Sequence, residues 1–250
     1  MGMSSITASV LGLAIALSPI AGARAAELKV LAGGSMTASL NELGPQFERA
    51  SGHKLTIVFD STPNLIKAVT SGAPFDLGVV PVDVMKDAAA RAKFAETTNI
   101  AHVGYGVAYR AGAAKPDVST PDALKQALLK AQTITLYPES AAGAYVLRVF
   151  ARLGIAEAMQ AKTKVQTAPG EIAKAVARGD AELGVFLTNV LIAPGVELAG
   201  AFPTELQQDL VFAAAVAADT KEAAAAKALI DFLHTPEAAA VLKAKGMTPG

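Results

Sequence analysis

Three short stretches of the chain place small and hydroxyl residues where a strand pattern passes directly into a helix pattern. They read AGGSMT, FDSTPN and YPESAAGAY and occupy residues 32–37, 59–64 and 137–145. A fourth stretch, TAPGEI at residues 167–172, also presents a helix start. The first turn of a helix carries backbone N–H groups without intrahelical partners and a partial positive charge. Convergent helix starts would therefore bind an anion without any lysine or arginine.

The candidate ligand-binding residues lie at these four junctions. Ser35 is placed to cap the first helix and to offer its hydroxyl, and Ser61 or Thr62 is placed in the same way at the second, with Pro63 at the first helical position. A micromolar complex needs about 8 kcal/mol, and a hydrogen bond to a charged acceptor contributes about 1.5–3 kcal/mol. Six or seven donors are therefore enough before ordering costs. At a single junction the hydroxyl could simply cap a helix, but the occurrence of three or four such junctions in one chain favours a binding site. Backbone donors are expected at the third and fourth junctions, from Ala142, Gly143, Gly170 and Glu171.

Motifs for other chemistries are absent or incomplete in the sequence. The run GGSMT at residues 33–37 lacks the last glycine of a G-x-S-x-G nucleophile elbow. Neither zinc nor calcium spacing occurs, and neither nucleotide-binding glycine motif is present. His53, His102 and His234 each have a structural explanation, in a turn, at a strand start and at a helix end. We expect a non-enzyme with no catalytic residue, no bare metal ion and no cofactor.

Composition narrows the classes of partner. The 250 residues include 22 basic and 22 acidic side chains, no cysteine and only 5% aromatic residues, while 52% are hydrophobic. The balanced charge gives no indication of a nucleic-acid or membrane-surface partner. The absence of cysteine excludes disulfides, thiolate chemistry and a lipid-attachment cysteine. The aliphatic core and the chain length are typical of an α/β protein with one large domain or two small ones.

The first residues are typical of an export signal. The apolar stretch ITASVLGLAIALSPI, residues 6–20, is too short to span a bilayer and is followed by small residues. This predicts a signal peptide at residues 1–25, with cleavage after about Ala25. The alternative is a buried N-terminal helix. We expect a periplasmic protein without a lipid anchor.

Strand and helix patterns alternate along the mature chain. This order predicts parallel strands joined by helices, with a kink or break at Gly44-Pro45 in the first helix. Residues 27–106 and 210–250 are expected to form one lobe and residues 107–209 a second, with a ligand cleft where strand ends and helix starts meet. The expected strands are 28–32, 54–59, 76–80, 102–110, 133–137, 164–166, 182–187 and 210–218; the expected helices begin near Met36 and include 63–72, 121–131, 144–153, 171–178, 221–233 and 236–245.

Residues 28–52 and 59–80 together resemble the N-terminal lobe of the periplasmic molybdate-binding proteins of ABC transporters. The runs SGAPFDL at 71–77 and GDAELGVFL at 179–187 also match segments of that family. The resemblance implies a two-lobe type II periplasmic binding fold of class α/β, with mixed, mostly parallel sheets flanked by helices. It also implies a tetrahedral oxyanion held in the cleft by serine hydroxyls and backbone amides.

The family's binding residues carry over onto the four junctions. Ser35 falls on the first-loop serine and Thr62, or Ser61 if the alignment slips by one, on the second-loop serine; Ala142 and residues 169–171 fall on backbone donors. The family's tyrosine is replaced here by Leu187, which removes one donor. Asp60 also adds a negative charge beside the second loop, which disfavours a dianion.

The sequence therefore predicts a monomeric solute-binding protein that captures a molybdate-like or tungstate-like oxyanion and delivers it to separate permease and ATPase subunits. A small organic carboxylate is the alternative ligand because of Leu187 and Asp60. Two other classes stay open: a ligand-sensing component, and an enzyme on the same fold that uses His102 or Glu139 as its base.

Overall fold

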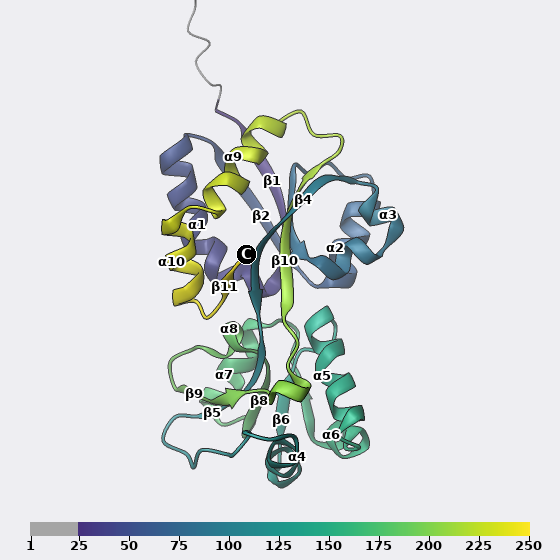
Figure 1. Cartoon of the computed structure of the whole chain (residues 1–250), viewed down its shortest axis with the longest axis vertical. Helices are drawn as coiled ribbons and strands as arrows, with labels where there is room; N and C mark the ends of the chain where they lie inside the picture. The colour runs from purple at the N-terminus through teal and green to yellow at the C-terminus, as the bar shows by residue number, and fades with distance from the viewer. Residues whose placement is uncertain (1–24) are drawn as a thin grey trace, which may run out of the picture.

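The computed structural model describes residues 25–250, so the predicted signal peptide lies outside the described residues except for its last position. The described chain forms two mixed sheets, each flanked by helices, and we call the part built on each sheet a lobe (Figure 1). The lobes lie end to end, with the starts of α2 and α5 facing each other across the gap between them.

Lobe 1 contains a six-stranded sheet with the strand order β11-β4-β10-β3-β1-β2. Helices α1, α9 and α10 cover one face, and α2 and α3 cover the other (Figure 1). The strands are β1 (Glu27–Gly33), β2 (Lys54–Asp60), β3 (Leu77–Pro81), β4 (Phe94–Val103), β10 (Leu210–Ala217) and β11 (Thr248–Pro249). The helices are η1 (Gly34–Met36), α1 (Thr37–Ser51), α2 (Thr62–Thr70), η2 (Val82–Lys86), α3 (Ala88–Arg91), α9 (Ala223–Leu233) and α10 (Pro236–Ala244).

Lobe 2 contains a five-stranded sheet with the strand order β7-β6-β8-β5-β9. Helices α7 and α8 lie on one side of it, and α5 and α6 on the other (Figure 1). The strands are β5 (Tyr105–Arg110), β6 (Ile134–Leu136), β7 (Thr163–Val165), β8 (Leu183–Leu187) and β9 (Val196–Ala201). The helices are α4 (Pro121–Lys130), α5 (Ala141–Arg152), α6 (Ala156–Lys162), α7 (Gly170–Arg178), α8 (Thr188–Leu191) and η3 (Thr204–Leu206).

The chain passes between the lobes twice, once at Gly104 between β4 and β5 and once through residues 202–209 between β9 and β10. The side chain of Gln207 joins the two passages: its Oε1 accepts from the backbone N–H of Tyr105 at 2.8 Å, and its Nε2 donates to the Tyr105 carbonyl at 2.9 Å. We place the lobe boundaries at these two passages. We call this double connection the hinge.

The sheets are mixed, as expected, but parallel pairs are fewer than the sequence indicated. Among the described strands, four pairings are parallel and five are antiparallel. The antiparallel ladders involve β4, β5 and β10, which run beside the passages, and the strands β9 and β11, which the sequence patterns did not indicate. Strand β10 returns from lobe 2 to lobe 1 and enters the middle of the first sheet.

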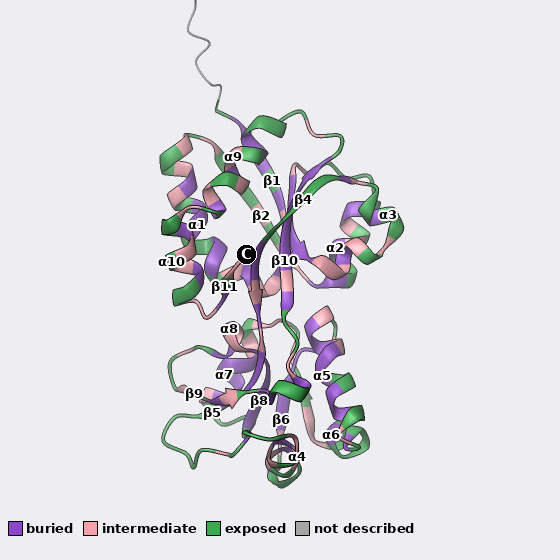
Figure 2. Ribbon diagram, in the orientation of Figure 1, coloured by how far each residue is buried: buried purple, intermediate pink, exposed green. Residues whose placement is uncertain are grey.

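The strands β3, β6, β8 and β10 are almost entirely buried, whereas the edge strands β2, β7 and β9 are not and the helices keep exposed outer faces (Figure 2). In β1 the residues Leu28, Val30 and Ala32 are buried, while Glu27 and Lys29 are exposed. This alternation places the apolar face of the strand against α1. The end of β1 is thereby held at the interlobe gap.

Helix α1 continues through Pro45, so the predicted break there is wrong. Proline has no N–H to donate to the carbonyl four residues earlier, a defect of about 3 kcal/mol in a helix interior. Leu40, Leu43 and Phe47 are all at most 3% exposed in this helix. Burial of this apolar stripe offsets the defect and keeps the helix intact.

Candidate functional site

A cleft between the lobes collects residues from all four predicted junctions. It encloses about 20 Å³, roughly the space of one water molecule, so the lobes must part to admit a larger ligand. No lysine, arginine or histidine is present among the described lining residues, and Asp60 is the charged one. The lining residues are Gly33, Gly34, Ser35, Asp60, Ser61, Thr62, Pro81, Tyr137, Ser140, Ala142, Pro169, Leu210 and Phe212.

Ser35 does not cap a helix, which corrects the sequence prediction. It lies inside η1, and neither η1 nor α1 has a side-chain cap at its start. Within residues 25–250 the Ser35 hydroxyl has no hydrogen-bond partner, although it lines the cleft. Side chains from both lobes occupy the space beside the neighbouring glycines: a Cβ on Gly33 would lie 2.9 Å from the ring of Phe212 in lobe 1, and one on Gly34 would lie 3.3 Å from Pro169 in lobe 2. The Ser35 hydroxyl is therefore free to donate to a ligand.

Ser61 and Thr62 differ in what their hydroxyls contact. Ser61 is the N-cap of α2 and accepts from the backbone N–H of Asn64 at 3.4 Å. Thr62 instead reaches lobe 2, where its Oγ1 accepts from the backbone N–H of Ala141 at 3.2 Å. Both residues are at least nine-tenths buried. The geometry makes Ser61 a helix cap and Thr62 a contact between the lobes.

The start of α5 supplies the third set of donors. Ser140, which the sequence reasoning did not select, caps this helix by accepting from the Gly143 N–H at 3.0 Å. Ala142 lines the cleft, but Gly143 does not. A Cβ on Gly143 would lie 2.6 Å from Cα of Pro138, so this glycine lets the helix start pack against the preceding loop. The helix therefore presents the 141–142 backbone to the gap.

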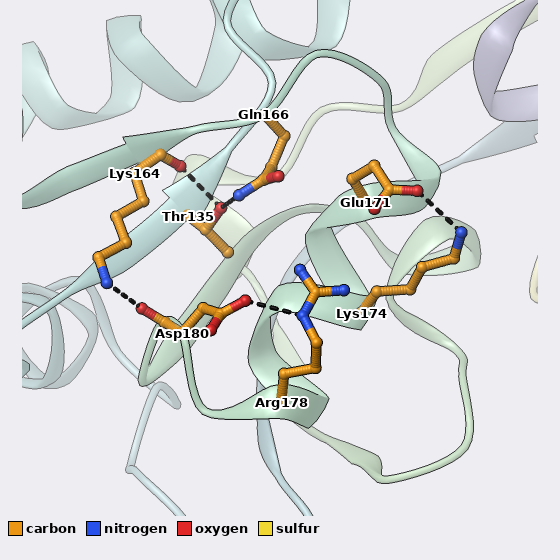
Figure 3. Close-up of polar contacts among 7 residues, drawn as sticks. All are labelled: Thr135, Lys164, Gln166, Glu171, Lys174, Arg178 and Asp180. Carbon is orange, nitrogen blue, oxygen red and sulfur yellow. Dashed lines mark hydrogen bonds and ion pairs between the residues drawn. The ribbon is translucent and has the colours of Figure 1, made fainter.

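The fourth junction contributes Pro169 rather than the predicted donors. Gly170 and Glu171 begin α7 but do not line the cleft. Glu171 accepts from Lys174 Nζ at 2.8 Å on the same helix (Figure 3). This hydrogen bond and the lysine charge hold the pKa of the Glu171 carboxyl below its usual value. Its side chain is thus engaged on the helix surface.

Asp60 lies at the end of β2 with one carboxylate oxygen already occupied. Its Oδ1 accepts from the Ser61 N–H at 2.7 Å and from Asn64 Nδ2 at 2.8 Å. Among the described residues, Oδ2 has no hydrogen-bond partner. The two bonds to Oδ1 place this carboxylate beside the start of α2. The cleft therefore holds one negative charge whose second oxygen is free.

Leu187, at the position where the resemblance implies a tyrosine, is fully buried and does not line the cleft. A different tyrosine does: Tyr137, at the end of the β6 segment, is 7% exposed, and its hydroxyl has no hydrogen-bond partner within the described chain. Sequence reasoning missed Tyr137, although it opens the YPESAAGAY junction. A tyrosine therefore lines the cleft, but it follows β6 rather than ending β8.

The three histidines and Glu139 lie outside the lining. His53 Nδ1 accepts from the Ala26 N–H at 3.0 Å. His102 Nδ1 lies 2.6 Å from Asp209 Oδ2 near the hinge. The ring nitrogens of His234 contact backbone carbonyls in lobe 1. Neither His102 nor Glu139, the bases named in the enzyme hypothesis, is among the residues that line the closed cleft.

A larger hollow of about 710 Å³ lies on lobe 2 alone, between residues 111–117 and α4. Exposed side chains of both signs line it, including Arg110, Lys130 and Glu182. In residues 25–250, no group of three or more acidic or histidine side chains is arranged to hold a metal ion. No helix in the same range is long and apolar enough to cross a membrane. The interlobe cleft is the place where four of the seven predicted ligand-binding residues come together, namely Ser35, Ser61, Thr62 and Ala142.

Two mixed α/β sheets joined by a hinge, with helix starts facing an interlobe cleft, define the type II periplasmic binding fold. The chain belongs to the bacterial extracellular solute-binding protein family, whose model matches residues 28–248.

Relatives of known type include both binding proteins and an isomerase. The chain is 30% identical to an aconitate isomerase from Pseudomonas sp., with 95% of this chain and 94% of that protein covered. It is 28% identical to the molybdate-binding protein ModA of Azotobacter vinelandii, with 90% of each covered. A solved periplasmic molybdate-binding protein from Azotobacter vinelandii shares the fold, with a TM-score of 0.73, 21% identity, and coverage of 88% of this chain and 98% of that one.

Proposed function

We propose that this protein is the extracytoplasmic solute-binding component of an ABC transporter and that it captures a small oxyanion of the molybdate or tungstate type. The observation that carries the proposal is the convergence of helix starts from both lobes on a cleft without basic side chains among its described lining residues. A ligand held this way exchanges its hydration shell for hydroxyl and backbone donors. Separate permease and ATPase subunits would be its partners, and the periplasm its location.

The donors supporting this proposal are Ser35, Thr62 and Tyr137 through their hydroxyls, and the backbone at Ala141 and Ala142. Thr62 already accepts from the Ala141 N–H when the cleft is closed. An anion would replace Thr62 as the acceptor of that hydrogen, and the Thr62 hydroxyl would then donate to the anion. A bound anion can thus replace the hydrogen bond between Ala141 and Thr62 with one bond to each of these residues.

Calorimetry and thermal unfolding against a panel of anions test the proposal. The panel should contain molybdate, tungstate, sulfate, phosphate and mono-, di- and tricarboxylates. A ligand at one hundred times its Kd stabilises the folded chain by about 2.7 kcal/mol. Stabilisation by molybdate or tungstate at micromolar concentration is the expected result. Stabilisation only by neutral or cationic solutes would contradict an anion site.

A second candidate is an isomerase or binding protein for a small carboxylate. The relative named as an aconitate isomerase favours this candidate, and the free oxygen of Asp60 offers a proton acceptor for the isomerase. An isomerase that moves a proton within its substrate needs a group that accepts and returns that proton. Asp60 and Tyr137 are the ionisable groups among the described lining residues. Asp60 therefore takes the place that the sequence hypothesis gave to His102 or Glu139.

Incubation with trans-aconitate, followed by proton NMR, separates this candidate from pure binding. Appearance of the cis isomer, with loss of turnover but retained binding in Asp60→Asn, would support an enzyme. Binding without turnover would leave a carboxylate-binding protein. Failure of trans-aconitate to bind, together with tight molybdate binding, would support the oxyanion proposal.

A further inference from the structure

Asn189, on α8 of lobe 2, contacts the first ligand loop of lobe 1. Its Nδ2 donates to the backbone carbonyl of Ser35 at 2.8 Å. The residue is 7% exposed, and its Oδ1 is buried without a hydrogen-bond partner among the described residues. Buried polar atoms without partners are rare in native proteins and call for an explanation.

The hydrogen bond from Nδ2 to Ser35 fixes the orientation of the Asn189 amide, since Oδ1 has no partner among the described residues that could do so. Turning the amide over would bring its oxygen against the Ser35 carbonyl oxygen, so only the observed orientation is attractive. Within the described chain, the Ser35 carbonyl is thus the sole hydrogen-bond partner of the Asn189 side chain. An Oδ1 without a partner costs folding free energy. The Nδ2 hydrogen bond to lobe 1 explains why an asparagine is present in spite of that cost.

The residue before Asn189 connects the same helix to the hinge. The backbone N–H of Thr188 donates to the Gly104 carbonyl at 2.9 Å, and its hydroxyl donates to the same carbonyl at 3.3 Å. Gly104 is the passage between β4 and β5. Two successive residues of α8 therefore contact the hinge and the ligand loop. Asn189 is absent from the residues lining the cleft, so it acts on a ligand only through Ser35.

We infer that Asn189 is a closure latch, a positioning residue that ties the Ser35 loop to α8 and so to the hinge when the lobes close. Opening the lobes separates Asn189 from Ser35, because the two residues belong to different lobes. The bond is consequently made in the closed state and broken in the open state. The latch slows ligand release without touching the ligand. This inference rests on the proposed function only for the choice of ligand.

Asn189→Asp is the most direct test because it keeps the shape of the side chain and removes the donor. An acceptor oxygen then faces the Ser35 carbonyl, which disfavours closure. We expect the Kd for molybdate, or for trans-aconitate if molybdate does not bind, to rise at least tenfold, chiefly through a faster dissociation rate. Asn41→Asp adds the same charge at an exposed position on α1 and is the matched control. Asn189→Ala removes the donor without adding charge and should raise the dissociation rate at least threefold.

A measurement without ligand keeps the inference testable if neither anion binds. Because the chain has no cysteine, spin labels can be placed at Lys67→Cys on α2 and Leu147→Cys on α5, both exposed. Asn189→Asp should shift the interlobe distance distribution towards longer distances, and Asn41→Asp should not. Unchanged distances and dissociation rates in a folded Asn189→Asp, or equal changes in the control, would overturn the latch. A lower melting temperature alone would indicate a purely structural residue and would also overturn it.

Discussion

The hydroxyl oxygen of Thr62 in lobe 1 accepts a hydrogen bond of 3.2 Å from the backbone N–H of Ala141 in lobe 2. The two residues are separated by 79 positions in the chain, and each begins a helix that faces the cleft. The Ala141 N–H, which the start of α5 would offer to an anion, is thus already hydrogen-bonded to an oxygen of the protein. The contact shows how the closed cleft satisfies its own polar groups before a ligand arrives.

Thr62→Val should weaken anion binding and leave the fold intact. The substitution removes a contact between the lobes and a ligand donor while keeping the branched shape, so a loss of about 1–3 kcal/mol of binding free energy is expected. Calorimetry with the best anion of the panel measures it. Thr70→Val, at the far end of the same helix where the hydroxyl bonds helix carbonyls, should bind as the unaltered protein does. An affinity of Thr62→Val equal to that of the unaltered protein would mean that Thr62 does not bind the ligand.

Ser35→Ala and Ser61→Ala should separate binding from stability. Ser35 has a free hydroxyl in the cleft and caps no helix, so its loss should cost about 1–3 kcal/mol of binding free energy with little change in unfolding. Ser61 caps α2, so its loss should lower the free energy of unfolding by about 1 kcal/mol. Urea unfolding and calorimetry on both variants measure the two quantities. The reverse pattern would exchange their assigned roles.

Gly143→Ala and Gly170→Ala should differ strongly although both glycines lie in the first turn of a helix. An added Cβ on Gly143 would collide with the Tyr137 carbonyl and with Pro138, which are backbone atoms that cannot easily move. Nothing lies within 4 Å of the corresponding position on Gly170, and its φ is not in the left-handed region. We expect Gly143→Ala to unfold at much lower urea concentration, and Gly170→Ala to gain about 0.4–1 kcal/mol. Similar unfolding curves would contradict this packing.

Tyr137→Phe should weaken binding, whereas Leu187→Tyr should not strengthen it. Tyr137 lines the cleft, and phenylalanine keeps its ring while removing a hydroxyl without a hydrogen-bond partner among the described residues. Tyrosine at the fully buried Leu187 position would overpack the lobe 2 core at a cost of about 1–3 kcal/mol of stability. Calorimetry on the first variant and urea unfolding on the second provide the measurements. Tighter binding by Leu187→Tyr would mean that the tyrosine of the resembling family had been restored.

Glu171→Gln should leave affinity unchanged and alter only the pH dependence of stability. The folded-state pKa of Glu171 is lowered by its hydrogen bond to Lys174 and by the lysine charge. A carboxyl with a lowered folded pKa stabilises the fold above its unfolded pKa and loses that contribution as the pH falls through the folded value. The small stability difference from Glu171→Gln should therefore be present at pH 7 and vanish at acid pH. Weaker anion binding by Glu171→Gln would mean that Glu171 is part of the binding site.

Local sequence patterns were sufficient for the fold class and for most elements. Alternating apolar residues predict β1, and the Ser-Thr-Pro run predicts the start of α2, because both depend on neighbours in the chain. The expected strand 102–110 is divided at Gly104 into the end of β4 and the whole of β5, and the first eight residues of β4 were not predicted. The short elements α3, α6, α8, β9 and β11 were not predicted either. Such segments are too short for a periodic pattern and are stabilised by tertiary contacts.

The sequence by itself determined that Ser35, Thr62 and Ala142 stand at helix starts and that the chain carries two sets of alternating strands and helices. Only the tertiary structure decided which hydroxyls are free: Ser35 has no partner among the described residues, Ser61 caps its own helix, and Thr62 contacts the other lobe. It also decided that Tyr137 lines the cleft while Leu187 is buried. The physical reason is that a helix start is specified within four residues, whereas the partner of a hydroxyl across a cleft depends on how two lobes close.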